Sequence, residues 1–349
     1  MKKLQIVSFF LFFVLLSSSL VVGGLPEKSF VYRENNELVS KNVVYGNDDF
    51  YFVHITDTHV MNKVFDHNEF SKKRFRSVLD LVCSFENKPA FIVITGDLTN
   101  WGGSGLSGAL NCQAFASCLY KKDGQFYADA NYSIPVYTTP GNHEFNFNRN
   151  LKNYYKIIDR DDRYVVNYSD VSLFFINSGP NHYLQPGDWF NNIKGDGLYN
   201  CDIDWLEDVL SNCNSSHKIV LMHHPAVNFR DEHGRMNDVI AHNRARFVEL
   251  CEDHDVDIVL AGHTHYSRIF DGDENFYYDN TSLNCSLYPT LFVQTDDCKD
   301  GVHYRNVSVI GNDIWIDGCV EVEGAYSSMN FNLQGADVRF EHLNWDLQK

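Results

Sequence analysis

Basic residues are scarce in this sequence. Lys and Arg together number 29 against 46 Asp and Glu, which gives a formal net charge of -17 with His neutral. Such an acidic surface repels a phosphate backbone, so general nucleic-acid binding by counterion release is excluded. The nine cysteines include no CxxC pair, and therefore neither a zinc ribbon nor a dithiol redox motif. Internal repeats, low-complexity tracts and Pro-rich linkers are also missing, which favours one elaborated domain.

What the sequence does contain is a globular composition rich in histidine. Hydrophobic residues make up 44% of the chain, an ordinary share for a folded protein. Fifteen His accompany the acid excess. Imidazole and carboxylate together are the ligand set of divalent transition metals. A phosphoester held by metal ions is therefore compatible with the acidic balance.

Residues 1–24 have the pattern of a secretory signal peptide. Lys2 and Lys3 form a positive start, residues 4–16 are almost entirely apolar, and small residues end the stretch, with cleavage expected near Gly23 or Gly24. The stretch also approaches the roughly 20 residues that a spanning helix needs, so an uncleaved membrane anchor is the alternative. Either reading predicts an exported protein, secreted or lumenal. No later stretch is long and apolar enough to span a membrane.

Export gives the cysteines a meaning, because an oxidising compartment favours disulfide bonds over free thiols. The odd count of nine leaves at least one thiol over, or an intermolecular bond. Short separations make three pairings the simplest to propose, namely Cys112 with Cys118, Cys201 with Cys213, and Cys285 with Cys298. N-glycosylation sequons begin at Asn131, Asn167, Asn214, Asn280, Asn284 and Asn306, and their use depends on the host.

From residue 50 onward, apolar runs of strand length alternate with helical patterns. The strand candidates cover residues 50–56, 91–95, 134–138, 171–177, 218–222 and 256–261. Such near-continuous hydrophobic runs are typical of strands covered on both faces. Apolar residues at three- and four-residue steps predict helices over residues 69–85, 202–210 and 237–251. The alternation predicts an α/β layered fold.

The pattern changes after about residue 270. Residues 291–294, 304–310 and 313–322 are strand candidates with no helix between them, and residues 310–313 have the sequence of a tight hairpin turn. We therefore expect an N-terminal lead-in at 25–49, a core at 50–270, and a C-terminal β-rich extension at 271–349. This extension would be an antiparallel meander packed on the core.

Metal-binding side chains follow five of the six strand candidates of the core. They are, in chain order, Asp57, His59, Asp97, Asn142, His143, His223, His263 and His265. In open α/β sheets ligands bind outside the carboxyl ends of the strands. The sequence therefore predicts that these side chains converge on one edge.

The spacing of these residues has a physical reading. Asp57 and His59 lie two apart, and on an extended chain both would point to the same side. Asp97 stands alone, and its two oxygens allow it to bridge two cations about 3.5 to 4 Å apart. Gly262 leaves the backbone room to turn the two imidazoles that follow it inward. With Asp97 shared, the set gives about four protein ligands for each of two ions.

The order of these blocks resembles the calcineurin-like metallophosphoesterase superfamily across roughly residues 50–270. The matching blocks are Asp57-x-His59, Gly96-Asp97, Gly141-Asn142-His143-Glu144, His223 and Gly262-His263-x-His265. The resemblance implies a four-layer fold in which two packed mixed β-sheets are flanked by helices. It also implies phosphomonoesterase or phosphodiesterase chemistry at two metal ions.

The resemblance assigns a role to each residue. One metal would be held by Asp57, His59, Asp97 and His265, and the other by Asp97, Asn142, His223 and His263. His143 would contact the substrate phosphate and protonate the leaving oxygen. A hydroxide on or between the metals would be the nucleophile. Ligands of this mix accept Mn, Fe, Zn or Co, so the identity of the metals stays open.

Two departures from relatives narrow the substrate. Purple acid phosphatases carry a Tyr three residues after the Gly-Asp aspartate, where this chain has Asn100, so a purple Fe(III) centre is not expected. Protein phosphatases of the superfamily carry an Arg after this motif, and residues 98–101 contain none. The pattern looks more like cyclic-nucleotide phosphodiesterases and exported sphingomyelinase-like phosphodiesterases.

The leading hypothesis is a secreted two-metal phosphoesterase that hydrolyses a phosphodiester or a nucleotide-type substrate. A phosphomonoesterase or nucleotidase of the same fold, and a non-catalytic metal-dependent binding protein at the cell surface, are the alternatives. The expected partner is a small-molecule or lipid-headgroup phosphoester, and no obligate protein partner is implied.

Three further features near these motifs have plainer readings. His54 is expected to be a satisfied core histidine and not a ligand. His224 is expected to support its loop or contact substrate, because adjacent strand residues face opposite ways. Residues 179–187 could form a lid over the site, although a surface loop is the simpler reading.

Overall fold

The computed structural model describes residues 31–34, 37–40, 43–44, 49–103, 105–119, 134–145, 149–182, 194–279 and 281–322. The expected signal or anchor at 1–24 lies outside these residues. Among the helices that are described, none is long and apolar enough to cross a membrane.

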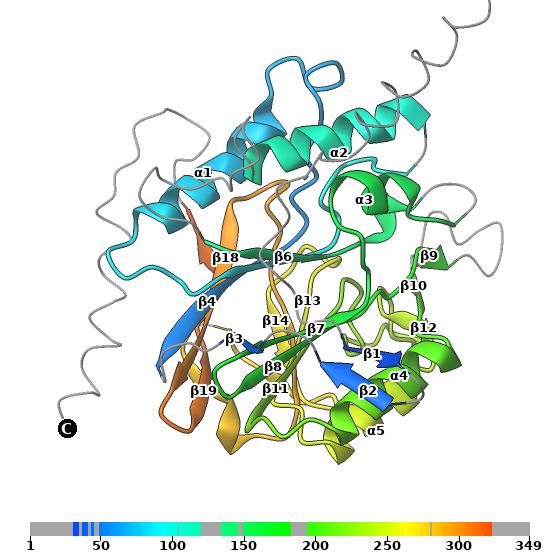
Figure 1. Ribbon diagram of the computed structural model, residues 1–349, viewed down its shortest axis with the longest axis vertical. Helices are drawn as coiled ribbons and strands as arrows, with labels where there is room; N and C mark the ends of the chain where they lie inside the picture. Colours follow the sequence, from blue (N-terminus) through cyan, green and yellow to red (C-terminus); the bar gives the residue numbers. More distant parts are fainter. Residues whose placement is uncertain are drawn as a thin grey trace, which may run out of the picture.

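Two mixed β-sheets pack face to face at the centre of the molecule (Figure 1). The first has the order β16-β19-β18-β4-β5-β6, and β20 also pairs with β18. Its strands are β16 (Leu283–Asn284), β19 (Asp313–Ile316), β18 (His303–Ile310), β4 (Phe50–Ile55), β5 (Ile92–Thr95), β6 (Val136–Thr139) and β20 (Val320–Glu321). Strands β4, β5 and β6 are parallel, whereas β18 runs antiparallel to β4.

The second sheet has the order β15-β14-β17-β13-β11-β8-β7-β3. Its strands are β15 (Phe276–Tyr277), β14 (Arg268–Phe270), β17 (Leu291–Gln294), β13 (Ile258–Ala261), β11 (His217–Leu221), β8 (Val171–Phe175), β7 (Tyr164–Tyr168) and β3 (Val43–Val44). Strands β8, β11, β13 and β17 are mutually parallel. A small sheet joins β9 (Asn181–His182), β10 (Lys194–Gly197) and β12 (Ile240–His242), and β1 (Val31–Glu34) pairs with β2 (Glu37–Ser40).

Helices cover the outer face of each sheet, which makes four layers (Figure 1). On the first sheet lie α1 (Phe70–Ser84), α2 (Gly105–Leu119) and α3 (Lys152–Ile157). On the second lie α4 (Asn200–Ser211) and α5 (Arg244–Asp253). Two short 3-10 turns, η1 (Asn142–Glu144) and η2 (Cys285–Leu287), complete the described elements. The expected α/β fold of two packed mixed sheets flanked by helices is confirmed.

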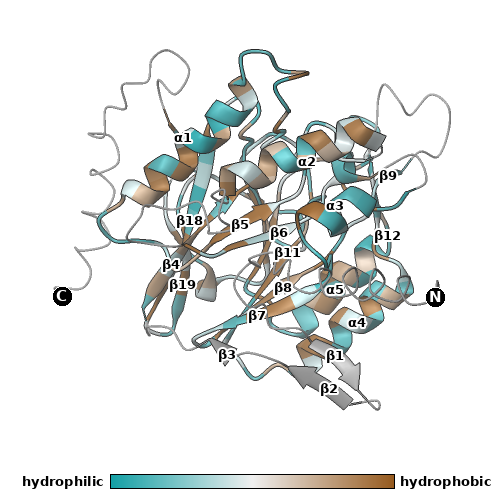
Figure 2. Cartoon of the chain, turned by 45° about the horizontal axis from the view of Figure 1, so that its top comes forward, coloured by the Kyte–Doolittle hydropathy of each residue, from teal (hydrophilic) through white to brown (hydrophobic). Residues whose placement is uncertain are grey.

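The alternation of residues along β4 shows how the layers form. Val53 and Ile55 face α1 and α2, whereas Phe52 faces the second sheet. All three side chains are fully buried, as expected for strands covered on both faces. Figure 2 shows the central strands in the brown of apolar residues, with teal polar residues on the helices around them.

All six strands predicted for the core are present, within two residues at their ends. The helix predicted over residues 237–251 begins only at Arg244, because β12 occupies residues 240–242 and pairs with β10. Helix α2 is missing from the sequence prediction, since its small residues and two glycines give no clear apolar stripe.

The region after residue 270 is rich in strands, as predicted, and β16, β19 and β18 pair antiparallel, but these strands do not form a separate meander packed on the core. They complete both sheets instead: β18 inserts beside β4 in the first sheet, and β17 lies parallel to β13 in the second. The predicted hairpin turn is confirmed, because Ile310 pairs with Asp313 and Gly311 has φ 61°.

The three proposed disulfide pairings are wrong, and none of these six cysteines is bonded to another. Cys112 and Cys118 both lie on α2, where six residues rise about 9 Å along the axis, beyond the reach of a disulfide. Helix α4 separates Cys201 from Cys213 in the same way. Cys298 lies in the core beneath α1, and Cys285 lies between the two sheets.

One ion pair is buried in this core. The guanidinium of Arg305, on β18, is fully buried and forms two 2.7 Å contacts with the carboxylate of Asp279. It also donates to the hydroxyl of Thr295 and to the carbonyl oxygen of Asp317. This set of partners satisfies a charge that could not otherwise be taken out of water.

Replacement of Asp279 by Ala is expected to lower the free energy of unfolding by about 3 to 5 kcal/mol, because it leaves the Arg305 charge buried and unpaired. Urea denaturation followed by circular dichroism measures the change. The double variant D279A/R305M removes both charges and should lose less than the single variant. Equal losses in the two would contradict the assigned cause.

Candidate metal centre

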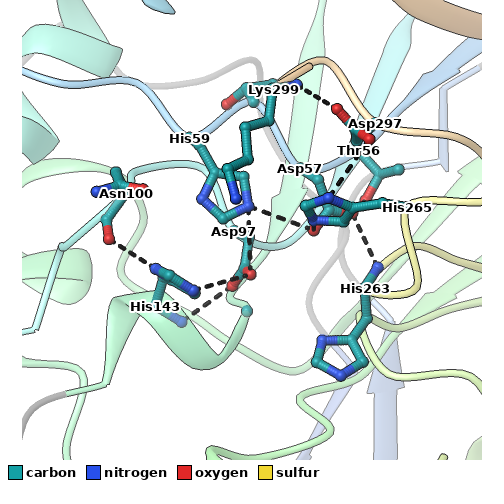
Figure 3. A network of polar contacts seen from close by, with 12 residues as sticks. Thr56, Asp57, His59, Asp97, Asn100, His143, His263, His265, Asp297 and Lys299 are labelled. Atoms are coloured by element: carbon teal, nitrogen blue, oxygen red, sulfur yellow. Dashed lines mark hydrogen bonds and ion pairs between the residues drawn. The ribbon is translucent and has the colours of Figure 1, made fainter. Parts of the chain in front are cut away.

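The loops that follow β4, β5 and β6 of the first sheet, and β11 and β13 of the second, meet at one place (Figure 3). Asp57 N donates to the carbonyl oxygen of Gly96 at 3.2 Å, and His59 N donates to that of Asp97 at 2.9 Å. Within the second sheet, Gly262 N donates to the carbonyl oxygen of His223 at 3.0 Å, and between the sheets His263 N donates to Asp57 Oδ2 at 2.8 Å. The structure thus brings the eight predicted side chains together.

Asp97 occupies the middle of this site, with its side chain 3% exposed. Its Oδ1 lies 3.3 Å from His223 Nε2 and accepts a hydrogen bond from His143 N at 2.9 Å. Its Oδ2 lies 3.6 Å from His59 Nε2. The two oxygens therefore face two different groups of side chains, which is the arrangement that a bridging carboxylate requires.

On the Oδ2 side, Asp57 and His265 join His59. Asp57 Oδ1 lies 3.3 Å from His265 Nε2 and 3.7 Å from His59 Nε2. The second oxygen of Asp57 accepts hydrogen bonds from the Thr56 hydroxyl at 2.7 Å and from His263 N at 2.8 Å. Asp57 Oδ1 and both ring nitrogens of His59 are buried, and no hydrogen bond to another described residue satisfies them.

On the Oδ1 side, His223 Nε2 lies 3.0 Å from Asn142 Oδ1. The other ring nitrogen, Nδ1, donates to the carbonyl oxygen of Thr95 at 2.9 Å, so Nε2 is turned towards the site. The His263 ring lies 5.1 Å from that of His223. Asp97, Asn142, His223 and His263 thus form a second group of metal-binding atoms.

The spacing of Asp57 and His59 suggested an extended backbone. The structure shows that the ligands do not lie on extended backbone. Five of them have positive φ in the left-handed region: Asp57 at 51°, His59 at 42°, Asp97 at 44°, His263 at 69° and His265 at 54°. Asp and His adopt this conformation more readily than most residues, but it still costs about 1 to 3 kcal/mol each. The hydrogen bonds between the loops offset this cost.

The glycines of the motifs are required by close approach. A Cβ at Gly141 would overlap the backbone nitrogen and Oδ1 of Asp97. A Cβ at Gly96 would overlap the ring of His223, and one at Gly262 would overlap Asp57 Oδ2. Each glycine therefore lets the next ligand-bearing loop press against the previous one. For Gly262, this close contact explains the need for glycine better than the inward turn of the two imidazoles that the sequence suggested.

His143 lies on the open side of the site, with 34% of its side chain exposed. Its Nδ1 donates to the carbonyl oxygen of Asn100 at 2.6 Å, and its Nε2 lies 3.7 Å from Asp97 Oδ2 (Figure 3). The bond to Asn100 fixes the ring so that Nε2 faces the site. The Asn100 contact involves its backbone and not its side-chain amide.

The electrostatics of the site keep its carboxylates ionised. Burial by itself would raise the pKa of Asp97, but the electrostatic interactions with the imidazoles of His143, His223 and His59 outweigh it and hold that pKa well below its usual range. Burial likewise opposes protonation of His223, but Asp97 and Asp57 raise its pKa to about 9. Ionised carboxylates are the form that binds cations.

Several residues with a part in the site were not predicted as functional. Glu144 is fully buried and accepts hydrogen bonds from Thr99 N and Gly141 N, both at 2.9 Å, which ties the loop after β5 to the loop after β6. Asp297, after β17, lies 3.4 Å from His265 Nδ1 through its Oδ2. Both follow strand ends, the signal that located the other residues.

The expectations for His54, His224 and residues 179–187 have different outcomes. His54 is a satisfied core histidine, buried and bonded to the hydroxyls of Thr95 and Thr295 at 2.8 Å. His224 is buried, with Nδ1 2.9 Å from the Ser178 hydroxyl, and it supports the loop as expected. Its Nε2 has no hydrogen-bond partner within the described part of the chain, and its ring lies 4.4 Å from His263. Most of the stretch 179–187 lies outside the described residues.

Buried imidazoles and ionised carboxylates at the carboxyl ends of strands from two packed sheets define a metal-dependent hydrolase. The chain belongs to the calcineurin-like phosphoesterase family, whose sequence model matches residues 50–267. As a member of this family it is a hydrolase that acts on phosphoric ester bonds. No curated protein sequence matches the chain significantly.

Solved structures with a similar fold include PhoD, a purple acid phosphatase and a putative 5′-nucleotidase. PhoD is 10% identical over 77% of this chain and 65% of its own, with a TM-score of 0.45. A purple acid phosphatase from yellow lupin (Lupinus luteus) seeds is 12% identical over 74% and 49%, with a TM-score of 0.45. A putative 5′-nucleotidase from Staphylococcus aureus is 13% identical over 84% and 58%, with a TM-score of 0.46.

The chain thus spans about half to two thirds of the length of these three proteins. Their names carry no information about the substrate of this chain.

Replacement of Gly141 by Ala is expected to weaken metal binding about ten- to hundredfold, because the added methyl group displaces the Asp97 carboxylate. Titration of the metal-free protein with Mn²⁺ or Zn²⁺ in a calorimeter measures the affinity. Gly234→Ala is the control: its φ of 72° makes the backbone at least as unfavourable for Ala as that of Gly141, at φ -105°, but its Cβ would meet no atom within 4 Å. Equal affinities in the two variants would refute the role given to Gly141.

Proposed function

We propose that this protein is a two-metal phosphoesterase that hydrolyses a phosphodiester or nucleotide-type substrate. The observation that supports this most is the position of Asp97, whose two oxygens face separate groups of ligands. One group is Asp57, His59, Asp97 and His265, and the other is Asp97, Asn142, His223 and His263.

These residues fit a pair of divalent cations. The buried atoms without hydrogen-bond partners among the described residues include Asp57 Oδ1 and both ring nitrogens of His59, which point to where a cation would be held. Nitrogen and oxygen donors of this kind suit Mn, Fe, Zn or Co. When bound, such ions supply Lewis acidity and lower the pKa of water.

His143 is the proposed proton donor to the leaving oxygen. The carbonyl oxygen of Asn100 holds the ring through Nδ1, so that only Nε2 is available to a substrate. The side chain is 34% exposed, whereas the neighbouring Asp97 and His59 are each 3% exposed, and it can therefore reach a bound phosphoester. A proton held at Nε2 would pass to the oxygen of the departing alcohol.

Small anionic esters fit this site better than phosphoproteins. The segment 98–101 contains no Arg, the residue that the resemblance leads one to expect there in a protein phosphatase. The acidic surface of this protein does not attract a polyanion over a wide area, so an anionic substrate must be attracted locally, at the site itself. A nucleotide or a lipid head group meets this condition, and no obligate protein partner is needed.

We also propose that the protein is exported, on the pattern of residues 1–24, and is secreted or held by an uncleaved N-terminal anchor. Expression in a secreting host followed by N-terminal sequencing of the recovered protein distinguishes the two. A first residue near position 24 or 25 is expected. Recovery only in the cytoplasm would contradict export.

Replacement of Asp97 by Ala is expected to reduce the metal content of the purified protein from two ions to one or none, because both groups of ligands lose a carboxylate. Plasma emission spectroscopy measures the content. Hydrolysis of bis-p-nitrophenyl phosphate should fall with it. A wild-type protein that holds no transition metal would refute the proposed function.

His143→Gln is expected to keep the metal content and to lower kcat about 10²- to 10⁴-fold, as is usual for loss of a general acid. His233→Ala is the control, because His233 is exposed and is not one of the site residues. Parallel assays on p-nitrophenyl phosphate and bis-p-nitrophenyl phosphate separate monoesterase from diesterase activity. Full metal content with no turnover of either ester would instead support a binding protein.

A further inference from the structure

Strand β17 brings a sixth loop to the site, from outside the matched family region. It runs parallel to β13, with Ile258 opposite Leu291, so that both strands end at the same edge. Thr295 N donates to the carbonyl oxygen of Ala261 at 3.0 Å, and Cys298 N donates to that of Thr56 at 3.1 Å. The chain after β17 is therefore fastened to the two strand ends that carry Asp57 and His263.

The turn that follows is held by the carboxylate of Asp297. Its Oδ1 accepts hydrogen bonds from Lys299 N at 2.7 Å and from Asp300 N at 2.6 Å. The His303 ring closes the turn from behind, with Nδ1 donating to the carbonyl oxygen of Asp297 at 2.7 Å. Asp297 Oδ2 also lies 3.4 Å from His265 Nδ1. One carboxylate therefore positions both the proposed metal ligand His265 and the backbone of Lys299.

The side chain of Lys299 extends from this turn towards the centre of the site. Figure 3 shows it running from beside Asp297 in the direction of His59. Lys299 is half-buried. The turn and the two loops below it therefore aim an ammonium group at the metal centre.

The charge of Lys299 is available to an incoming ligand. Among the residues that the structure describes, its ammonium forms no salt bridge, whereas the nearby Arg305 is fully buried and paired with Asp279. A lysine ammonium is a compact charge with three donors, and lysine is a common ligand of phosphate oxygens. The site otherwise offers carboxylates and imidazoles.

We propose that Lys299 binds a non-bridging oxygen of the substrate phosphoryl group, opposite His143, and so adds a positive charge to substrate binding. This inference rests on the proposed phosphoesterase function of the same site. It extends the active site beyond the matched residues 50–267 to the loop after β17.

The test compares Lys299→Met, which keeps the length of the side chain without its charge, with Lys299→Arg. Inorganic phosphate is titrated into each metal-loaded protein in a calorimeter, and kcat/KM is measured on p-nitrophenyl phosphate and bis-p-nitrophenyl phosphate. Lys299→Met should weaken phosphate binding and lower kcat/KM by about ten- to hundredfold, as expected for loss of one charged hydrogen bond. Lys299→Arg should recover most of both. Lys156→Met, at an exposed position on α3, is the matched control.

The outcomes separate this inference from the function on which it rests. Wild-type affinity and kcat/KM in Lys299→Met would overturn the role of Lys299 and leave the phosphoesterase intact. Loss of metal content in Lys299→Met would show that the residue acts through the scaffold and would also overturn the role. A wild-type protein that binds phosphate but hydrolyses neither ester refutes the esterase, while the phosphate titrations still decide the role of Lys299.

Discussion

The burial of one carboxylate constrains the whole active edge of this protein. Asp97 lies almost out of water, and an ion in that position is tolerated only if every side of it finds a partner. Its partners come from three other loops: His59 after β4, His143 after β6 and His223 after β11. Both sheets must therefore be assembled before the charge of Asp97 is compensated, and the site and the fold depend on the same contacts.

The same constraint explains why the loops are so tightly arranged. Ligands from different strands reach one carboxylate only if their backbones nearly touch, which is what the absence of a Cβ at Gly96, Gly141 and Gly262 permits. The left-handed conformations of the ligands are part of this arrangement, and they occur two to four residues beyond the ends of the strands. The local strain is held by the hydrogen bonds that join the loops.

The sequence allowed the strands, and the residues that follow them, to be predicted with a simple rule. Runs such as the one ending at Ile55 are buried on both faces, and a polar residue directly after such a run marks the carboxyl end of a strand. The rule did not reveal the backbone conformation of Asp57, because the same local sequence is compatible with a left-handed and with an extended conformation. It also missed Asp297 and Lys299. Leu291–Gln294 has the pattern of any strand, and its parallel place beside β13 depends on pairing across the sheet, which local sequence does not encode.

The position of β18 has a consequence for how the chain acquires its structure. Phe50 at the start of the core pairs with Val309 near the end of the described chain, so the sheet that carries Asp97 is closed by a strand from the opposite end. Contacts of such high sequence separation give a protein a high contact order and slow folding. During synthesis, β4 would emerge long before its neighbour and would present an open hydrogen-bonding edge. This edge of β4 therefore stays without its native partner until the last strands of the core have been made.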